Sequence, residues 1–142
     1  MIAEKLRKAT FKHVEAELRA YPDTKKEIEK RREELMYMSD VDENVGAGKN
    51  SYRTPTKPTE RIATRLTMDM RLRSMEEIVE AIESVLEKLD HTQRKLVELR
   101  YFRRYQEMSW EGIALECNIH VQTAFKYRRM IIEAIAERLG WR

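Results

Sequence analysis

Apolar residues recur at helical spacing along most of the chain, and this pattern predicts an all-α fold. The clearest stretch runs from Met75 to Leu89, where successive apolar residues are separated by three, one, three, three, one and three positions. This spacing places them on one face of an amphipathic helix. We expect one long helix that ends near Leu89, with either Thr59 or Thr64 as its N-cap.

The first 38 residues are expected to form a charged helical arm. Residues 3–20 lack helix breakers and carry one apolar stripe, made of Leu6, Phe11, Val14 and Leu18. Pro22 is expected to end or kink this helix, or to begin the next one, which would run over residues 23–38. The second helix is so highly charged that we expect a helical hairpin, or a segment that becomes ordered only against a partner.

A change of composition over residues 39–59 predicts a linker. The segment contains Gly46, Gly48, Pro55 and Pro58 among small polar residues, which are typical of loops. This linker would separate the arm, residues 1–38, from a C-terminal domain of residues 60–142 that includes the long amphipathic helix.

The C-terminal domain ends in a pattern typical of a helix-turn-helix. Asp90 and Gln93 have capping-box spacing at the start of one helix, and Ser109 is a suitable N-cap for the next. Asn118 tolerates the left-handed conformation that a turn between two helices requires. Residues 121–139 then predict a second, longer helix. A helix-turn-helix inserts its second helix into the major groove of DNA.

The first turns of this second helix carry side chains that suit contacts with base edges. The candidates for base contact are Val121, Gln122, Phe125 and Lys126. Glutamine bonds adenine in a bidentate way, lysine reads guanine, and apolar side chains contact the thymine methyl group. The candidates for phosphate contact, which orients the protein without reading sequence, are Arg128, Arg129, Arg103 and Arg104. The alternative interpretation is an ordinary solvated helix.

The distribution of charge agrees with a DNA-binding C-terminal region. The chain has 142 residues, of which 37% are charged and 8% aromatic, and its formal net charge is +3. Residues 91–142 contain ten Lys/Arg and six Asp/Glu, whereas residues 1–90 contain 18 and 19. The positive excess therefore coincides with the predicted helix-turn-helix, as a DNA-binding surface requires.

Catalytic and metal-binding chemistry has no support in the sequence. Cys117 is the single cysteine, and the three histidines show no metal-ligand spacing. No phosphate-binding glycine loop, Ser-His-Asp set or pair of catalytic carboxylates stands out, so we expect neither an enzyme nor a cofactor. No apolar run reaches membrane-spanning length, and a cytosolic protein is the simpler interpretation.

Three stretches of the C-terminal region resemble region 4 of bacterial sigma factors. They are residues 96–101 (LVELRY), 109–114 (SWEGIA) and 118–124 (NIHVQTA). With residues 125–129, the long preceding helix and the charged arm, the whole chain is similar to the RinA/ArpU group of phage-encoded transcriptional regulators. The chain departs from the sigma pattern where Gly112 replaces a glutamate, Asn118 a glycine and His120 a serine.

The resemblance implies an activator of phage late genes that acts at a promoter in the bacterial cytoplasm, together with host RNA polymerase. One recognition helix reads few base pairs, so we expect a homo-oligomer assembled through the long amphipathic helix or the arm. Two alternatives remain open. A phage DNA-packaging recognition subunit would use the same helix-turn-helix within a stable ring, and a helical module that recruits polymerase would lack salt-dependent affinity for DNA.

Overall fold

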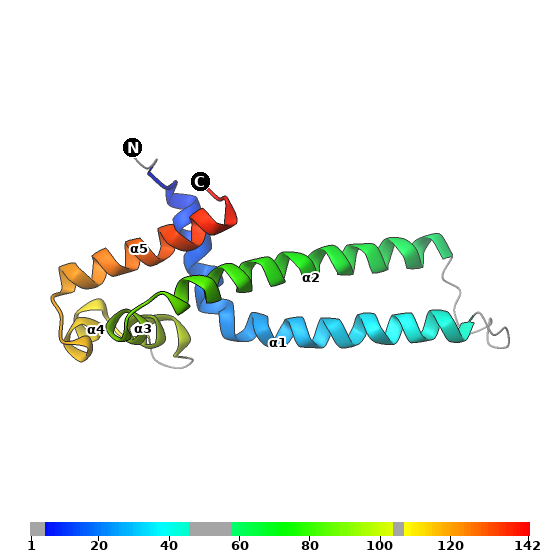
Figure 1. Cartoon of the computed structure of the whole chain (residues 1–142), viewed down its shortest axis with the longest axis horizontal. Coiled ribbons are helices and arrows are strands. Elements are labelled where there is room, and N and C mark those ends of the chain that lie inside the picture. Colours follow the sequence, from blue (N-terminus) through cyan, green and yellow to red (C-terminus); the bar gives the residue numbers. More distant parts are fainter. Residues whose placement is uncertain (1–4, 46–57, 104–106) are drawn as a thin grey trace. The chain divides into compact units, whose positions relative to one another are not determined.

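All regular structure in the described part of the chain is helical, as the apolar pattern predicted. The computed structural model describes residues 5–45, 58–103 and 107–142. In chain order the elements are α1 (Lys8–Val45), α2 (Pro58–Glu87), α3 (His91–Val97), the π-helical segment η2 (Glu98–Phe102), α4 (Trp110–Cys117) and α5 (Val121–Leu139) (Figure 1). The all-α class is therefore confirmed.

The N-terminal arm differs in detail from the two helices that the sequence predicted. The helix α1 continues through Pro22 and ends at Val45, seven residues beyond the expected end at Met38. Proline lacks a backbone N–H and is a common site of helix distortion, but the chain on either side of Pro22 is rich in good helix formers. The helix α2 begins at Pro58, a residue type favoured at the first helical position. Residues 46–57 of the predicted linker lie outside the described residues.

The contacts within the chain define two compact units. Unit 1 comprises residues 1–23 and 77–142, and unit 2 comprises residues 24–76. The first boundary falls directly after Asp23, next to Pro22, where the helical hydrogen-bond ladder lacks one donor. This division differs from the segments expected from composition, because the first turns of the arm belong to the same unit as the C-terminal helices.

The core of unit 1 explains why the start of α1 belongs to it. Its largest fully buried apolar side chains come from α1, α2, α3 and α5: Val14, Leu18, Ile82, Val97, Ile132 and Ile135. Burial of one such side chain contributes about 1.5–3 kcal/mol. A second buried cluster joins α3, α4 and α5 and consists of Leu96, Ile113, Ala114, Cys117 and Ala124. The two clusters together hold α5 against the rest of the unit.

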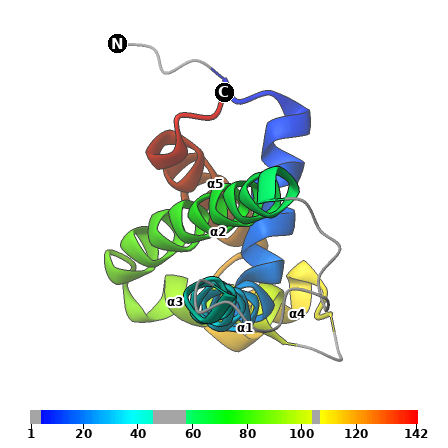
Figure 2. The ribbon, with the colours of Figure 1, turned by 90° about the vertical axis from the view of Figure 1, so that its right-hand side faces the viewer.

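The end of the chain is attached to the first turns of α1. The Thr10 hydroxyl donates a hydrogen bond to the carbonyl of Arg142, and the rings of His13 and Trp141 stack with centroids 4.5 Å apart. Figure 2 shows the C-terminus beside the start of α1. These contacts add to the apolar core in holding the start of α1 within unit 1.

Unit 2 is an antiparallel pair formed by the second part of α1 and the first part of α2 (Figure 1). Ile28 and Leu72 are its buried apolar residues, and Arg32 Nη2 lies 3.2 Å from Glu76 Oε1. Much of its apolar surface faces solvent instead; the exposed large side chains are Met36, Tyr37, Ile62, Leu66 and Met70. Among its described residues, unit 2 therefore leaves five large apolar side chains facing solvent, a feature typical of interaction surfaces.

Candidate nucleic-acid interface

The helices α4 and α5 have the bounds and the connection that the sequence predicted. Ser109 is the N-cap of α4, where its Oγ accepts a hydrogen bond from the Gly112 N–H at 3.1 Å. Asp90 and Gln93 form a complete capping box at the start of α3. The helix α5 begins at Val121 and ends at Leu139, followed by Gly140 in the left-handed conformation. Local capping residues thus define where α3 and α4 begin and where α5 ends.

The turn between α4 and α5 depends on one residue with positive φ. Asn118 has φ 58° and ψ 44°, the left-handed conformation, and within the described part of the chain it is the only non-glycine residue with positive φ. The next residue, Ile119, donates from its N–H to the Ala114 carbonyl at 2.9 Å. His120 is the N-cap residue of α5 but its side chain makes no capping hydrogen bond. A serine at this position would accept a hydrogen bond from a backbone N–H in the first turn of α5, which the His120 side chain does not do.

The predicted base-contact residues lie in the first two turns of α5, and most face solvent. Gln122 and Lys126 are exposed, and the Phe125 side chain is 42% exposed. Val121 is half-buried and packs against the cluster around Ala124. The structure therefore brings one amide, one ammonium and one aromatic ring onto a single solvent-facing surface of α5, which we call the base face.

The four arginines expected at phosphates lie in different surroundings. Arg129 is exposed one turn after the base face, and Arg103 is exposed just beyond η2, where its Nη1 lies 3.5 Å from Met108 Sδ. Arg104 lies outside the described residues. Arg128 is half-buried and turned toward α1, so it is not available to phosphate in the same way as Arg129.

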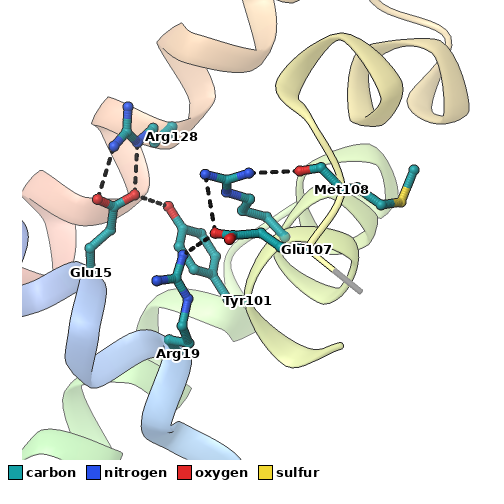
Figure 3. A network of polar contacts seen from close by, with 7 residues as sticks. Glu15, Arg19, Tyr101, Glu107, Met108 and Arg128 are labelled. Carbon is teal, nitrogen blue, oxygen red and sulfur yellow. Dashed lines mark hydrogen bonds and ion pairs between the residues drawn. The ribbon is translucent and has the colours of Figure 1, made fainter. Parts of the chain in front are cut away.

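Arg128 is held by a carboxylate of α1 (Figure 3). Its Nε donates to Glu15 Oε2 at 2.8 Å and its Nη2 to Glu15 Oε1 at 2.9 Å. The Tyr101 hydroxyl of η2 donates to the same Oε2 at 2.6 Å. Glu15 thus links α1, η2 and α5 through charge-assisted hydrogen bonds, which are stronger than neutral ones. No local pattern in the sequence indicates this link, because Glu15 and Arg128 are 113 residues apart.

The shared hydrogen bonds change the ionisation of the groups that make them. Burial would raise the pKa of Glu15, but hydrogen bonds from Arg128 and Tyr101 and the charges of Arg128 and Arg19 outweigh it and lower that pKa below its ordinary value. Burial, together with the negative charge of Glu15, raises the pKa of the Tyr101 hydroxyl. The hydrogen bond to Glu15 is the main reason that the pKa of Arg128 is raised. Glu15 and Arg128 therefore stay a charged pair at neutral pH.

A second polar group holds the segment that leads into α4. The carboxylate of Glu107 accepts a hydrogen bond from Arg19 Nη2 at 2.9 Å and lies 3.4 Å from Arg100 Nη2 (Figure 3). Arg100 Nη1 also donates to the Met108 carbonyl at 2.6 Å, and its guanidinium lies 4.7 Å from the centre of the Trp110 ring. These contacts fix the start of α4 against α1 and η2.

The described residues provide neither a metal site nor a membrane-spanning helix. They contain no group of three or more histidine, cysteine, aspartate or glutamate side chains able to hold a metal ion. Cys117 is a free, buried thiol whose pKa burial raises. None of the helices in the described ranges is both long and apolar enough to cross a membrane.

Comparison with known proteins identifies a family and one phage relative. The transcriptional activator rinA of Staphylococcus phage phi11 is 27% identical over 136 residues, which are 95% of this chain and 94% of that protein. This similarity agrees with the resemblance to the RinA/ArpU group that the sequence motifs indicated. No solved structure matches the chain. A family model described as "Protein of unknown function (DUF722)" matches residues 14–137. Since that match covers well over half of its length, the chain belongs to the DUF722 family.

Proposed function

We propose that the chain is a sequence-specific DNA-binding protein that activates transcription of phage genes. The observation that carries this proposal is the base face of α5, which follows a tight turn and exposes Gln122, Phe125 and Lys126 while the opposite side of the helix is buried. The similarity to a phage transcriptional activator supports it and favours it over a DNA-packaging subunit.

In this proposal α5 is the recognition helix of a helix-turn-helix like that of sigma region 4. Gln122 pairs with adenine and Lys126 with guanine, while Phe125 and the exposed part of Val121 contact thymine methyl groups. Arg129 and Arg103, with Arg104 beside it in sequence, contact phosphates. Arg128 acts inside the protein, because Glu15 already uses two of its N–H donors.

The wider role follows from the same proposal. The chain acts at promoters of phage late genes in the cytoplasm of the bacterial host, in concert with host RNA polymerase. It needs no cofactor and catalyses no reaction. These points are supported by the resemblance to the RinA/ArpU group and by the similarity to a phage transcriptional activator.

We further propose that two or more copies associate through unit 2. Met36, Ile62 and Leu66 are exposed and line a groove of about 770 Å³, which Arg61, Arg65 and Asp69 also line. Residues 24–45 and 58–76 contain nine Lys/Arg and ten Asp/Glu, so this surface suits a second copy of itself better than the anionic DNA. A paired protein would read two half-sites, which gives the specificity that one recognition helix lacks.

Binding to duplex DNA as a function of salt concentration tests this function. The full chain is titrated onto fluorescent duplexes that carry phage promoter sequence or shuffled sequence. We expect tighter binding to a promoter duplex, with affinity that falls steeply as salt rises. Absence of binding at low salt would overturn the proposal and favour a module that contacts protein only.

A further inference from the structure

A basic groove of about 610 Å³ lies in unit 1, where the start of α1 meets α5. Its lining includes Lys5, Lys8, Phe11, Lys12, Glu15 and Arg128. The three lysines are exposed to solvent, and all three line this groove. We call them the lysine row. The contacts proposed for α5 make no use of them.

The charge of the lysine row is not compensated by the described part of the chain. Glu15 is the one carboxylate in the lining of the groove, and both of its oxygens accept hydrogen bonds from Arg128. Within the described ranges Lys5, Lys8 and Lys12 have no ion-pair partner. Three positive charges therefore remain directed to the solvent side of the groove.

Helix stability does not explain why these charges are there. The helix α1 begins at Lys8 and has no acidic residue in its first turn. Residues 5–14 contain four Lys/Arg and no Asp/Glu. Cations at the start of a helix oppose the helix dipole and weaken the helix slightly. The charge of the lysine row thus suits an external anion rather than the helix that carries it.

A chain of ring contacts leads from the lysine row to the base face. The Arg128 guanidinium lies 5.0 Å from the centre of the Phe11 ring and 5.3 Å from that of Trp110. The Trp110 and Phe125 rings have centroids 5.6 Å apart. All four residues belong to unit 1. The groove is therefore linked to the base face through a continuous series of packed side chains within unit 1.

We propose that Lys5, Lys8 and Lys12 bind the DNA backbone phosphates next to the bases that α5 contacts. This inference rests on the proposed function. On the side of α5 that carries Arg128, that arginine is already paired with Glu15. The lysine row, near the N-terminus of the chain, then supplies the phosphate contact on this side. Contacts of this kind orient a recognition helix without reading sequence.

The test compares two triple variants of the full chain that lose the same charge. In the first, Lys5→Gln, Lys8→Gln and Lys12→Gln remove the lysine row. In the second, Lys25→Gln, Lys26→Gln and Lys30→Gln remove three exposed lysines of α1 that belong to unit 2 but do not line its groove around Met36, Ile62 and Leu66. Thermal melting followed by circular dichroism verifies that both variants fold. Affinity for a preferred and a shuffled duplex is then measured against salt.

The first variant is expected to lose affinity for both duplexes by the same factor. The slope of log affinity against log salt should fall by up to about three, which is about one for each phosphate contact. The ratio of the two affinities should stay unchanged, as should the slope of the second variant. Replacement of the same three lysines by arginine should retain the wild-type slope.

Three outcomes would overturn the inference. The first is a wild-type salt slope in the lysine-row variant. It would refute phosphate binding by the lysine row while leaving the proposed DNA binding by α5 intact. The second is an equal loss of DNA affinity in both triple variants, which would show that only the total charge of the chain matters. The third is failure of the wild-type chain to bind DNA, which refutes the proposed function as well. If the lysine-row variant binds DNA normally but fails to activate transcription, the row contacts a protein.

Discussion

At the scale of single residues, the structure separates two neighbouring arginines that look equivalent in the sequence. Arg128 points inward and is paired with Glu15, whereas Arg129 faces solvent. The difference comes from helix geometry, because consecutive residues lie about 100° apart around the axis. The position of the pairing carboxylate, on α1, could not be predicted from the local pattern. Arg128 is therefore a structural residue in this account, and Arg129 a DNA-contact residue.

Replacement of Glu15 by glutamine tests the structural role of that pair. The variant leaves the guanidinium of Arg128 half-buried without its counterion, so we expect a loss of about 1–3 kcal/mol in the free energy of unfolding at pH 7. The exposed Glu133→Gln variant on α5 is the control and should stay within about 0.5 kcal/mol of wild type. Urea denaturation measures both values. Equal stabilities for the two variants would contradict the account.

The same pair predicts how stability depends on pH. The pKa of Glu15 is below 4.5 in the folded protein and near its ordinary value in the unfolded chain, so the unfolded chain binds the proton first as pH falls. The contribution of the pair is complete well above pH 4.5 and is lost as pH falls through the folded pKa. The free energy of unfolding of wild type and Glu15→Gln is measured by denaturation from pH 7 to pH 3. The variant should lose less of this free energy over that range than the wild type. Parallel curves would refute this assignment.

Two residues of the base face are expected to read sequence. Gln122→Ala and Lys126→Ala should each cost about 1–3 kcal/mol at the preferred DNA site and change little on shuffled DNA. Arg129→Ala should instead weaken binding to every duplex alike and reduce the salt slope by about one. Competition binding on preferred and shuffled duplexes distinguishes the two behaviours. A uniform loss in the Gln122 and Lys126 variants would show that they contact phosphate only.

At the scale of secondary-structure elements, the C-terminal helices were the most predictable part of the fold. Their ends are set by residues within one turn, such as the Asp90 and Gln93 capping box, the Ser109 cap and the left-handed Asn118. The extension of α1 to Val45 and the π-helical turn η2 were not predicted, because no residue within one turn marks either of them. The contact between Glu15 and Arg128 was missed for the same reason.

Asn118 offers a test of the turn between α4 and α5. Asn118→Ala places an ordinary side chain at φ 58°, and we expect a loss of about 1–2 kcal/mol in the free energy of unfolding. Asn118→Gly relieves that restriction, so this variant should be more stable than Asn118→Ala by about the same amount. Chemical denaturation compares the three proteins. Equal losses in both variants would show that the amide side chain, and not the backbone conformation, matters here.

At the scale of the whole molecule, the start of α1 is part of the proposed DNA-binding unit. Leu18→Ala removes a fully buried side chain from the core that α1 shares with α2 and α5, and should cost about 2–5 kcal/mol. Leu115→Ala is the matched control, since Leu115 is 83% exposed, and should change stability by less than about 0.5 kcal/mol. Thermal melting measures both. A small effect of Leu18→Ala would indicate that residues 60–142 fold without the arm.

The apolar face of unit 2 predicts the oligomeric state. Ile62→Glu together with Leu66→Glu places charge on a surface that is proposed to be covered by a second copy, so the variant should be monomeric. Leu115→Glu adds a charge in unit 1 and should leave the assembly unchanged. Sedimentation velocity over a range of concentrations measures the mass of each protein. A wild-type chain that is monomeric at every concentration would contradict the proposed assembly.

Selection of bound sequences from a random pool of DNA duplexes tests the central claim most directly. The wild-type chain and Lys126→Ala are each carried through repeated rounds of binding, and the recovered duplexes are sequenced. We expect a reproducible motif for the wild type, composed of two half-sites, and relaxed preference at one position of each half-site for Lys126→Ala. Tight but unselective binding, with no motif in the recovered sequences, would contradict sequence-specific recognition by α5.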